Sequence, residues 1–314
     1  MTKESPRVSV IMPCFNEANR LPASVGSVAN QTFKDFELVV IDDGSRDGTF
    51  RVMEALAVRY PFLRIFSQAN KGQSAARNRG IRETRGELIA FLDADDEWHP
   101  EFLESMVAAL DGDPDAGLAY CGWQNVGLPG ARGEPFVPPD YEDQNKLETF
   151  MKRCRWPIHA AMTRKRLIEE AGGFDEDLAA GEDFALWLQI APFNKLVRVP
   201  RVLAYYHHKH GGQQITEDRL RLALNHMHAQ KGFLRKNPDI ESRLRSSKIK
   251  EIIYGELRRC AFDAYWRREL EVAQPLFRRL LGAWYVQPGD LRYLLPALLP
   301  RCLYVMVIHS RDRK

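Results

Sequence analysis

Short apolar runs alternate with helically spaced segments through the first third of the chain. Four runs rich in β-forming residues occupy residues 7–12, 35–41, 62–66 and 87–92. Residues 73–83 form a helical segment, and residues 49–60 form another, with one face made of Phe50, Met53, Ala57 and Tyr60. Near-continuous apolar strands separated by helices of this length predict a mostly parallel sheet covered by helices on both faces. The predicted fold class is therefore α/β.

The pattern changes twice further along the chain. Seven of the thirteen residues 127–139 are Gly or Pro, which predicts a long surface loop. After this loop we expect helices over residues 145–153, 164–171 and 181–191 and short strands over 196–199 and 202–206. Beyond about Thr216 the strand patterns end, and amphipathic helices, including residues 261–281, fill the rest. We therefore predict an α/β domain over residues 1–215 and a helical region over residues 216–314.

Charge is distributed unevenly between these two regions. From Glu217 onward the chain has 20 basic and 11 acidic residues, whereas the preceding part has 25 basic and 31 acidic residues. The acidic first part argues against nucleic acid as a partner. The basic tail either suits an anionic membrane surface or forms a solvated helical face.

The end of the chain is apolar but interrupted. Residues 293–308 are rich in Leu, Tyr and Val, and Pro296, Pro300 and Arg301 break the run. A bilayer requires about 20 apolar residues, so this stretch is too short to cross it. Two hypotheses remain, which are contact with the membrane interface and packing of its leucines on the first domain.

Cysteine content and the N-terminus indicate the compartment. The five cysteines are far apart and form no C-x-x-C pair, which disfavours a disulfide framework and a cysteine zinc site. The N-terminus enters a strand pattern without an apolar leader. We therefore expect a cytoplasmic protein.

Acidic clusters follow the apolar runs, at the strand ends where α/β sheets bind ligands. Asp93-Ala94-Asp95 offers two hard oxygen donors, which suit a divalent cation held mainly by a ligand's phosphates. Helix capping by Asp95 or Asp96 is the structural alternative. Asp42-Asp43-Gly44-Ser45 either forms a turn and helix cap or presents a carboxylate to a base or ribose.

Residues 70–80 combine a flexible turn with two cations. Lys71 and Arg77 suit a diphosphate, and the glycines allow close approach of the backbone. The sequence contains neither G-x-G-x-x-G nor a Walker loop, which excludes the usual dinucleotide and P-loop sites.

Taken in order, five segments resemble the inverting family 2 glycosyltransferases of the GT-A fold. They are residues 8–17, Val-Val-Ile-Asp-Asp-Gly-Ser ending at Ser45, Asn-x-Gly with Ala-Arg-Asn-x-Gly over residues 70–80, Phe-Leu-Asp-Ala-Asp-Asp ending at Asp96, and Gly-Gly-Phe-Asp-Glu with Gly-Glu-Asp-Phe-Ala-Leu-Trp over residues 172–187. The resemblance covers about residues 7–215. It implies transfer of one sugar, with inversion, from a nucleoside-diphosphate sugar, expected to be a UDP-sugar, to a glycan or lipid-linked acceptor in bacterial surface polysaccharide synthesis.

The resemblance also implies roles for matching residues. Asp183 would be the catalytic base, with Glu182 beside it. Asp95 would bind Mn²⁺ or Mg²⁺ directly, while Asp93 would hold ribose and metal. Arg77 would face the diphosphate, and His210 would lie near the metal or diphosphate. The nucleoside pocket would be lined by Pro13, Asn16, Glu17, Asp42 and Asp43.

Departures from the family pattern narrow the function. The Q-x-x-R-W string of processive synthases does not follow Asp183, which disfavours chain elongation. The cluster His207-His208-Lys209-His210 replaces a more usual Tyr-Arg-x-His. We expect His210 to be the equivalent histidine, with a register open by one or two residues, and a solvated histidine cluster is the alternative. A sugar nucleotidyltransferase and a non-catalytic nucleotide-sugar binder are the rival functions, although the glycine-rich N-terminal loop of the former is missing. The sequence leaves the sugar, the acceptor and the oligomeric state open.

Overall fold

The contacts within the chain define two compact units. The computed structural model describes residues 5–142, 145–208 and 219–311. One unit comprises Met1–Phe150 and Cys154–Gln214, and the other comprises Met151–Arg153 and Ile215–Lys314.

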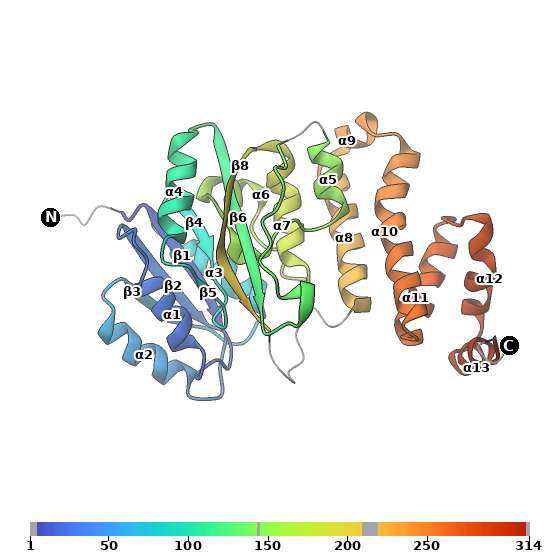
Figure 1. The fold of residues 1–314 in the computed structure, drawn as a ribbon, viewed down its shortest axis with the longest axis horizontal. Coiled ribbons are helices and arrows are strands. Elements are labelled where there is room, and N and C mark those ends of the chain that lie inside the picture. The colour runs from blue at the N-terminus through green and yellow to red at the C-terminus, as the bar shows by residue number, and fades with distance from the viewer. Residues whose placement is uncertain (1–4, 143–144, 209–218, 312–314) are drawn as a thin grey trace. The chain divides into compact units, whose positions relative to one another are not determined.

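The first unit is built on one mixed sheet with the strand order β3-β2-β1-β4-β7-β6-β8-β5 (Figure 1). Strand β1 pairs in parallel with β2 and β4, and β2 pairs in parallel with β3, so their carboxyl ends share one edge. Strand β7 is antiparallel to β4 and β6, whereas β6 and β8 are parallel. The strands are β1 Val8–Cys14, β2 Phe36–Asp42, β3 Leu63–Ser67, β4 Leu88–Phe91, β5 Glu97–Trp98, β6 Ala116–Val126, β7 Ala161–Arg164 and β8 Lys195–His207.

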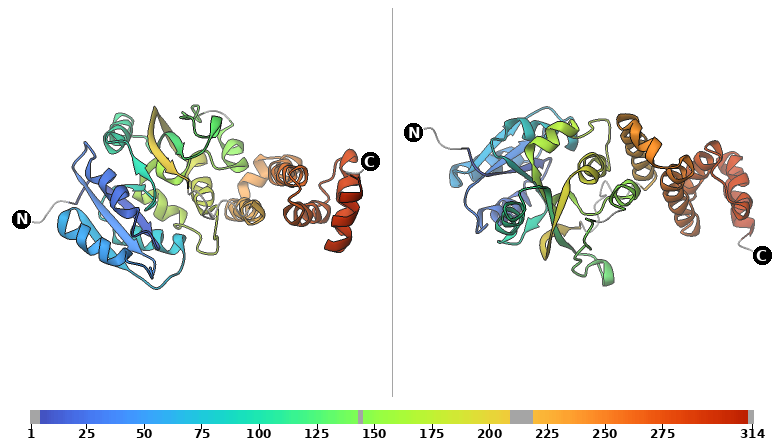
Figure 2. Two further views of the ribbon diagram at one scale, coloured as in Figure 1. Left: turned by 60° about the horizontal axis from the view of Figure 1, so that its bottom comes forward. Right: turned by 90° about the horizontal axis from the view of Figure 1, so that it is seen from above.

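Helices flank this sheet (Figure 2). They are α1 Leu21–Ala29, α2 Thr49–Arg59, α3 Gln73–Glu83, α4 Phe102–Gly112, α5 Lys146–Lys152, α6 Lys165–Ala171 and α7 Glu182–Ile190. Every residue of β1 and β2 is buried, as the apolar runs require for strands covered on both faces. The predicted α/β class with a mostly parallel sheet is confirmed.

Two strand boundaries that we predicted at prolines are wrong. We expected Pro13 to end the first strand, but β1 continues to Cys14. The β1–β4 ladder stops at Ile11, so the missing N–H of Pro13 costs no bond to β4. The two short strands expected over 196–199 and 202–206 are one strand, β8. Its register with β6 jumps from Val199 to Val202, so Pro200 and its neighbour are accommodated in an irregularity.

Several elements were missed by the pattern, and one residue predicted to be packed is exposed. Strands β5, β6 and β7 and helices α1 and α4 were not predicted from the pattern. In α2 Met53 is buried, but Phe50, expected on the same packed face, is 37% exposed. The predicted loop over residues 127–139 is confirmed, apart from a 3-10 turn at Gly130–Arg132 and backbone bonds between Phe136 and Trp123.

The second unit is helical in its described part and has a core of its own. Its helices are α8 Arg219–Lys236, α9 Pro238–Arg243, α10 Ser246–Trp266, α11 Leu270–Gly282, α12 Leu291–Leu294 and α13 Arg301–Arg311. The segment predicted over residues 261–281 is a hairpin of α10 and α11, because Arg268 adopts a left-handed φ of 65°. The core residues include Leu257, Ala261, Tyr265, Phe277, Leu280, Leu294, Tyr304 and Ile308.

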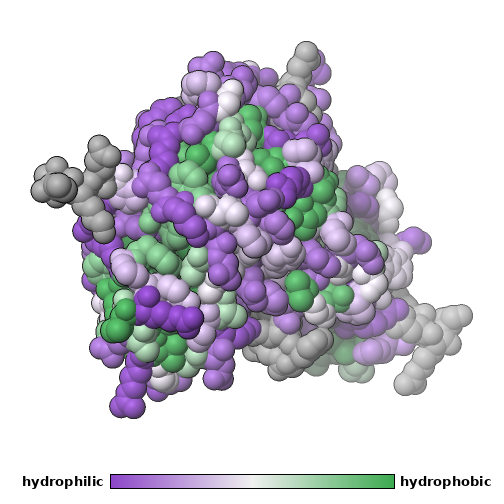
Figure 3. Space-filling model, turned by 60° about the vertical axis from the view of Figure 1, so that its left-hand side comes forward, coloured by the Kyte–Doolittle hydropathy of each residue, from purple (hydrophilic) through white to green (hydrophobic). Residues whose placement is uncertain are grey.

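The surface is predominantly hydrophilic on the face of the α/β unit shown in Figure 3, where hydrophobic residues form separate patches. Within the described residues, no helix combines the length and the apolar character that a membrane span requires.

Candidate functional site

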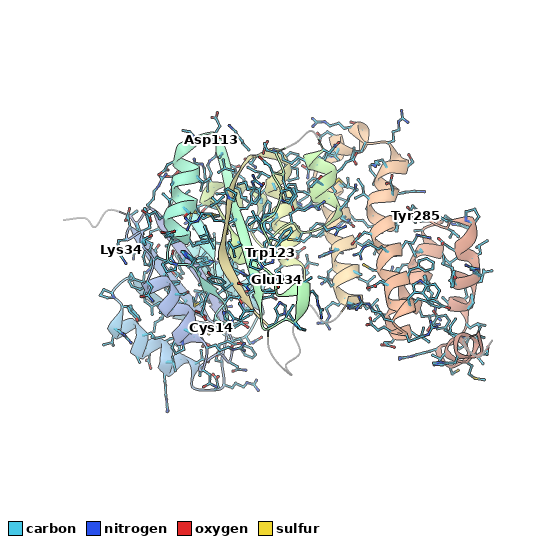
Figure 4. All side chains as sticks on the ribbon, in the orientation of Figure 1. Cys14, Lys34, Asp113, Trp123, Glu134 and Tyr285 are labelled. Atoms are coloured by element: carbon cyan, nitrogen blue, oxygen red, sulfur yellow. The ribbon has the colours of Figure 1, made fainter. Side chains whose placement is uncertain are left out.

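The acidic clusters gather at the carboxyl edge of the parallel strands. Cys14, the last residue of β1, marks this edge in Figure 4, and Asp113 lies at the opposite side of the unit. Asp42 ends β2, and Asp93 lies two residues after the end of β4. The parallel register of β1 with β2 and β4 therefore brings these separate motifs to one edge.

The Asp42-Asp43 pair is buried and shapes the surrounding loops. Asp42 Oδ1 accepts a bond from Ser45 N at 3.1 Å, which confirms the turn that the motif predicted. Asp43 Oδ1 accepts from Lys71 N at 2.9 Å, and Asp43 Oδ2 accepts from Gly72 N at 2.8 Å. Gly44 has φ of 73°, and a Cβ there would lie 2.8 Å from Asn70 N, so glycine is required. Asp43 therefore holds the loop that carries Lys71.

The loop after β1 is fixed by polar contacts of its own. Asn16 has a left-handed φ of 55°, and its side-chain oxygen accepts from Arg46 N at 2.8 Å. Glu17 N donates to Thr49 Oγ1 at 2.9 Å. The Glu17 carboxylate pairs with Arg20 at 3.0 Å. This loop therefore brings an arginine, which the sequence analysis did not single out, beside the expected nucleoside pocket.

Asp93 and Asp95 each contact an arginine. Arg77 Nη2 donates to Asp93 Oδ1 at 2.8 Å, and Arg20 Nη1 lies 3.4 Å from Asp95 Oδ2. Gln73 Nε2 also donates to Asp93 Oδ1, at 3.0 Å. The side chains of Asp93 and Asp95 are 19% and 22% exposed, so both carboxylates are partly accessible to a ligand.

Asp96, the last residue of the same motif, has a different role. It is fully buried, accepts from His207 N at 2.8 Å and lies 3.1 Å from His159 Nδ1. Burial raises the pKa of Asp96 and lowers that of His159 to about 4. The helix that follows, α4, has no side-chain cap, so the alternative that Asp95 or Asp96 caps a helix is wrong. Asp96 instead fixes the end of β8.

Arg77 connects Asp93, which follows β4, with Glu182 at the start of α7. Its guanidinium is 1% exposed and bonds to Asp93 on one side and to Glu182 on the other, at 2.8 and 2.7 Å. Burial, the largest single effect, lowers the Arg77 pKa, but the charges and hydrogen bonds of Asp93 and Glu182 together outweigh it, so the Arg77 pKa is raised. We expected this residue at a diphosphate, and the structure places both of its terminal nitrogens on carboxylates.

The neighbours of Arg77 explain the rest of its motif. Asn78 Oδ1 accepts from Phe174 N at 2.8 Å, and Asn78 Nδ2 donates to Phe174 O at 2.9 Å. A Cβ on Gly80 would lie 2.4 Å from a methyl of Ile11, so glycine lets α3 approach β1. The motif therefore ties the segment before Glu182 to the central sheet.

Glu182 and Asp183 occupy the first turn of α7, after Gly181 with φ of 74°. Negative charge is favourable at this end of a helix. Desolvation, followed by the charge of Glu182, raises the Asp183 pKa to about 6. Cys154 Sγ lies 3.7 Å from Asp183 Oδ2, and burial keeps this thiol protonated by raising its pKa. Asp183 is half-buried, and its raised pKa lets its carboxylate accept a proton near neutral pH.

The remaining expected residues lie in differing environments. Pro13 is buried in β1 opposite Ile41, and Lys71 is exposed. His207 Nε2 is 3.3 Å from Glu97, and His208 Nε2 is 3.2 Å from Asn125 Oδ1. His210 falls outside the described residues. Sequence reasoning missed the roles of Arg20, Cys154 and Asn78, and no signal in the sequence shows them, because their partners lie 75, 29 and 96 residues away along the chain.

The chemistry of the acidic edge suits a divalent cation. Asp93 and Asp95 supply hard oxygen donors, and Mg²⁺ usually takes one or two protein carboxylates together with phosphate oxygens and water. Among the described residues there is no group of three or more His, Cys, Asp or Glu placed to hold a metal. Oxygen atoms of water or of a bound ligand would complete the shell of a cation there.

Comparison with known proteins identifies a family model and several relatives that match this chain. The family model "Glycosyl transferase family 2" matches residues 9–170. YibD of Escherichia coli, an uncharacterised glycosyltransferase, is 37% identical over 124 residues, which are 39% of this chain and 36% of that protein. A cholesterol galactosyltransferase of Borreliella burgdorferi is 45% identical over 98 residues, 31% of this chain and 27% of that protein. The chain thus spans about a third of the length of these relatives.

Solved structures share the fold at low sequence identity. TarS of S. aureus in complex with UDP has a TM-score of 0.59 and 17% identity, with 98% of this chain and 88% of that chain covered. The mannosyltransferase PcManGT of Pyrobaculum calidifontis, in complex with GDP-Man and Mn²⁺, has a TM-score of 0.58 and 21% identity, with 99% and 88% covered.

Proposed function

Because the chain belongs to glycosyl transferase family 2, we propose that it transfers one sugar, with inversion, from a nucleoside-diphosphate sugar to a hydroxyl of a glycan or lipid-linked acceptor. The observation that carries this proposal is the Asp93–Arg77–Glu182 chain of ion pairs, which links the acidic strand end to the helix bearing Asp183. We expect a UDP-sugar donor and a role in bacterial surface polysaccharide synthesis. The catalytic domain in this proposal is the α/β unit.

The donor side would be formed by the loops at the strand ends. Pro13, Asn16, Glu17 and Asp42 would surround the nucleoside, and Asp43 would act through the loop that it holds. Asp95, with Asp93, would hold Mn²⁺ or Mg²⁺, and a structural neighbour that binds GDP-Man and Mn²⁺ supports this assignment. A divalent cation would neutralise the charge that develops on the leaving diphosphate. Lys71 is an exposed cation near the same loops, and His210 is kept as a candidate.

The acceptor side would centre on Asp183. Its raised pKa lets the carboxylate remove the proton of the attacking hydroxyl as the glycosidic bond forms. Arg77 would hold Glu182 in place beside it through their ion pair. In-line displacement by that hydroxyl inverts the anomeric centre, so an α-linked donor gives a β-linked product.

A panel of radiolabelled nucleotide sugars tests the reaction class. We expect sugar transfer, or slow donor hydrolysis without an acceptor, for at least one UDP-sugar in the presence of Mn²⁺. Pyrophosphate exchange would instead identify a sugar nucleotidyltransferase. Donor binding without turnover across acceptor extracts would identify a non-catalytic binding protein.

We further propose peripheral contact between the helical unit and the cytoplasmic face of an anionic membrane. Leu291, Leu295 and Leu298 recur at helical spacing in α12 and the 3-10 turn Leu295–Leu298, and they are 43%, 54% and 60% exposed. Leu294 and Ala297, between them, are buried in the unit's own core. The three exposed leucines form an apolar strip beside this core, and exposed apolar patches mark interaction surfaces. Residues 291–311 contain three arginines and no acidic residue, which complements an anionic lipid surface.

Vesicle sedimentation tests this contact. We expect the protein to sediment with phosphatidylglycerol vesicles at low salt and to be released as salt rises. Burial of each half-exposed leucine is worth about 1 kcal/mol, so Leu295→Ser with Leu298→Ser should weaken binding roughly tenfold or more.

Val58→Ser is the matched control, because Val58 is 88% exposed on α2 in the other unit. Equal recovery of the native protein with neutral and anionic vesicles at low salt would refute membrane contact. It would leave packing of the leucines on the catalytic domain, or self-association, as their role.

A further inference from the structure

The two arginines that contact Asp93 and Asp95 differ in accessibility. Arg77 is 1% exposed, and both of its terminal nitrogens bond to carboxylates. Arg20 keeps 37% of its side chain exposed, lies 3.4 Å from Asp95 Oδ2 and is 3.0 Å from Glu17. Arg77 is therefore a fixed part of the protein, whereas the contact between Arg20 and Asp95 is long, partly solvated and weak.

Glu17 gives Arg20 a second anchor in the same site. The Glu17 side chain is 13% exposed, and its backbone N–H is fixed by Thr49. If the contact with Asp95 is broken, the Glu17 contact still holds the guanidinium at the carboxyl edge of the sheet. Arg20 itself precedes α1, whose first residues, Leu21 and Pro22, fix the backbone there.

These contacts have a consequence for any cation that uses Asp95. A guanidinium and a divalent ion compete for the same carboxylate oxygen, because each is attracted by its negative charge. After such an exchange, Arg20 would offer unused N–H donors beside the phosphates that complete the metal's shell. Guanidinium groups are well suited to phosphate oxygens.

We propose that Arg20 is an exchangeable counter-ion of Asp95, which a divalent cation displaces and which then binds the diphosphate of the donor. This inference rests on the proposed function, because it takes Asp95 as the metal-binding residue. In this proposal Arg20 makes the diphosphate contact that we expected of Arg77, because both terminal nitrogens of Arg77 already bond to carboxylates. Glu17, expected beside the nucleoside, is the tether of Arg20 in this arrangement.

Two binding measurements on Arg20→Gln test the proposal. Mn²⁺ binding without nucleotide, followed by the electron paramagnetic resonance signal of free Mn²⁺, should become roughly threefold tighter because the competing charge is gone. UDP binding at saturating Mn²⁺, followed by calorimetry, should become roughly tenfold weaker because charged hydrogen bonds to phosphate are lost. A merely structural role would weaken both, so the opposite signs are diagnostic.

Two further variants serve as controls. Arg20→Lys keeps the charge and should stay near the native protein for Mn²⁺ while recovering part of the UDP affinity. Arg82→Gln removes an exposed arginine of α3 and should change neither constant. If the native protein binds Mn²⁺ and UDP but Arg20→Gln leaves Mn²⁺ affinity unchanged or weaker, the Arg20 proposal is wrong and the donor site stands. If neither the native protein nor Arg20→Gln binds Mn²⁺, with or without UDP, the metal assignment of the proposed function fails as well.

Discussion

Asp183→Asn should lower turnover by at least about 10²-fold while leaving donor affinity nearly unchanged. The amide keeps the size of the side chain, but it cannot accept the proton of the acceptor hydroxyl. Asp183 lies in the first turn of α7, beside the Arg77 ion pairs, and has a pKa raised to about 6. Steady-state kinetics with separate determination of donor Kd measures both quantities.

Glu182→Gln and Glu170→Gln provide the comparison. Glu170 is an exposed carboxylate of α6, and its loss should not affect kinetics. Near-normal transfer by Asp183→Asn together with loss of transfer in Glu182→Gln would make Glu182 the base. Full activity in both variants would leave the proposed mechanism without a base.

The pH profile gives an independent check on the same residue. The base acts in its ionised form, so kcat should fall as the pH drops below about 6, the pKa of Asp183. The negative charge of Glu182 raises this pKa, and therefore Glu182→Gln should move the acidic limb to lower pH. A limb that stays in place in Glu182→Gln would mean that another group controls it.

Asp95→Ala should abolish metal-stimulated turnover. A cation stabilises the leaving diphosphate in the transition state by several kcal/mol. Its loss raises the barrier by that amount, so the rate should fall roughly 10²-fold or more. Asp95 is suited to this role because it is partly exposed and contacts Arg20, an exchangeable partner, whereas Asp93 is held by Arg77. Turnover measured across a Mn²⁺ titration should be flat in the variant and saturable in the native protein.

Asp115→Ala is the matched control, because Asp115 is an exposed aspartate outside the site. Thermal melting should show that Mn²⁺ with UDP stabilises the native protein and Asp115→Ala more than Asp95→Ala. Full activity of the native protein in excess chelator would remove the metal from the mechanism.

The sequence alone predicted the features that depend on local pattern. The apolar runs at β1 and β2 are buried along their whole length, as a parallel sheet covered by helices requires. The order of the acidic and glycine motifs predicted the family, which the family model over residues 9–170 confirms. Strand β6 was missed, although turn-forming residues 112–115 precede it, because it has no simple alternation of polar and apolar positions and contains Gly117 and Gly122, a residue type that is depleted in strands.

Partnerships across the chain were decided by the tertiary structure. The motif around Arg77 predicted a diphosphate contact, whereas the fold places Arg77 between Asp93 and Glu182, the latter 105 residues away. No motif indicated a role for Arg20 or Cys154, which contact Asp95 and Asp183 across 75 and 29 residues. Periodicity shows which face of an element is buried, and a motif shows which side chains are reactive. Which single side chain meets another depends on strand order and helix packing, so the residue classes of this site were determined by the sequence and their pairing by the folded sheet.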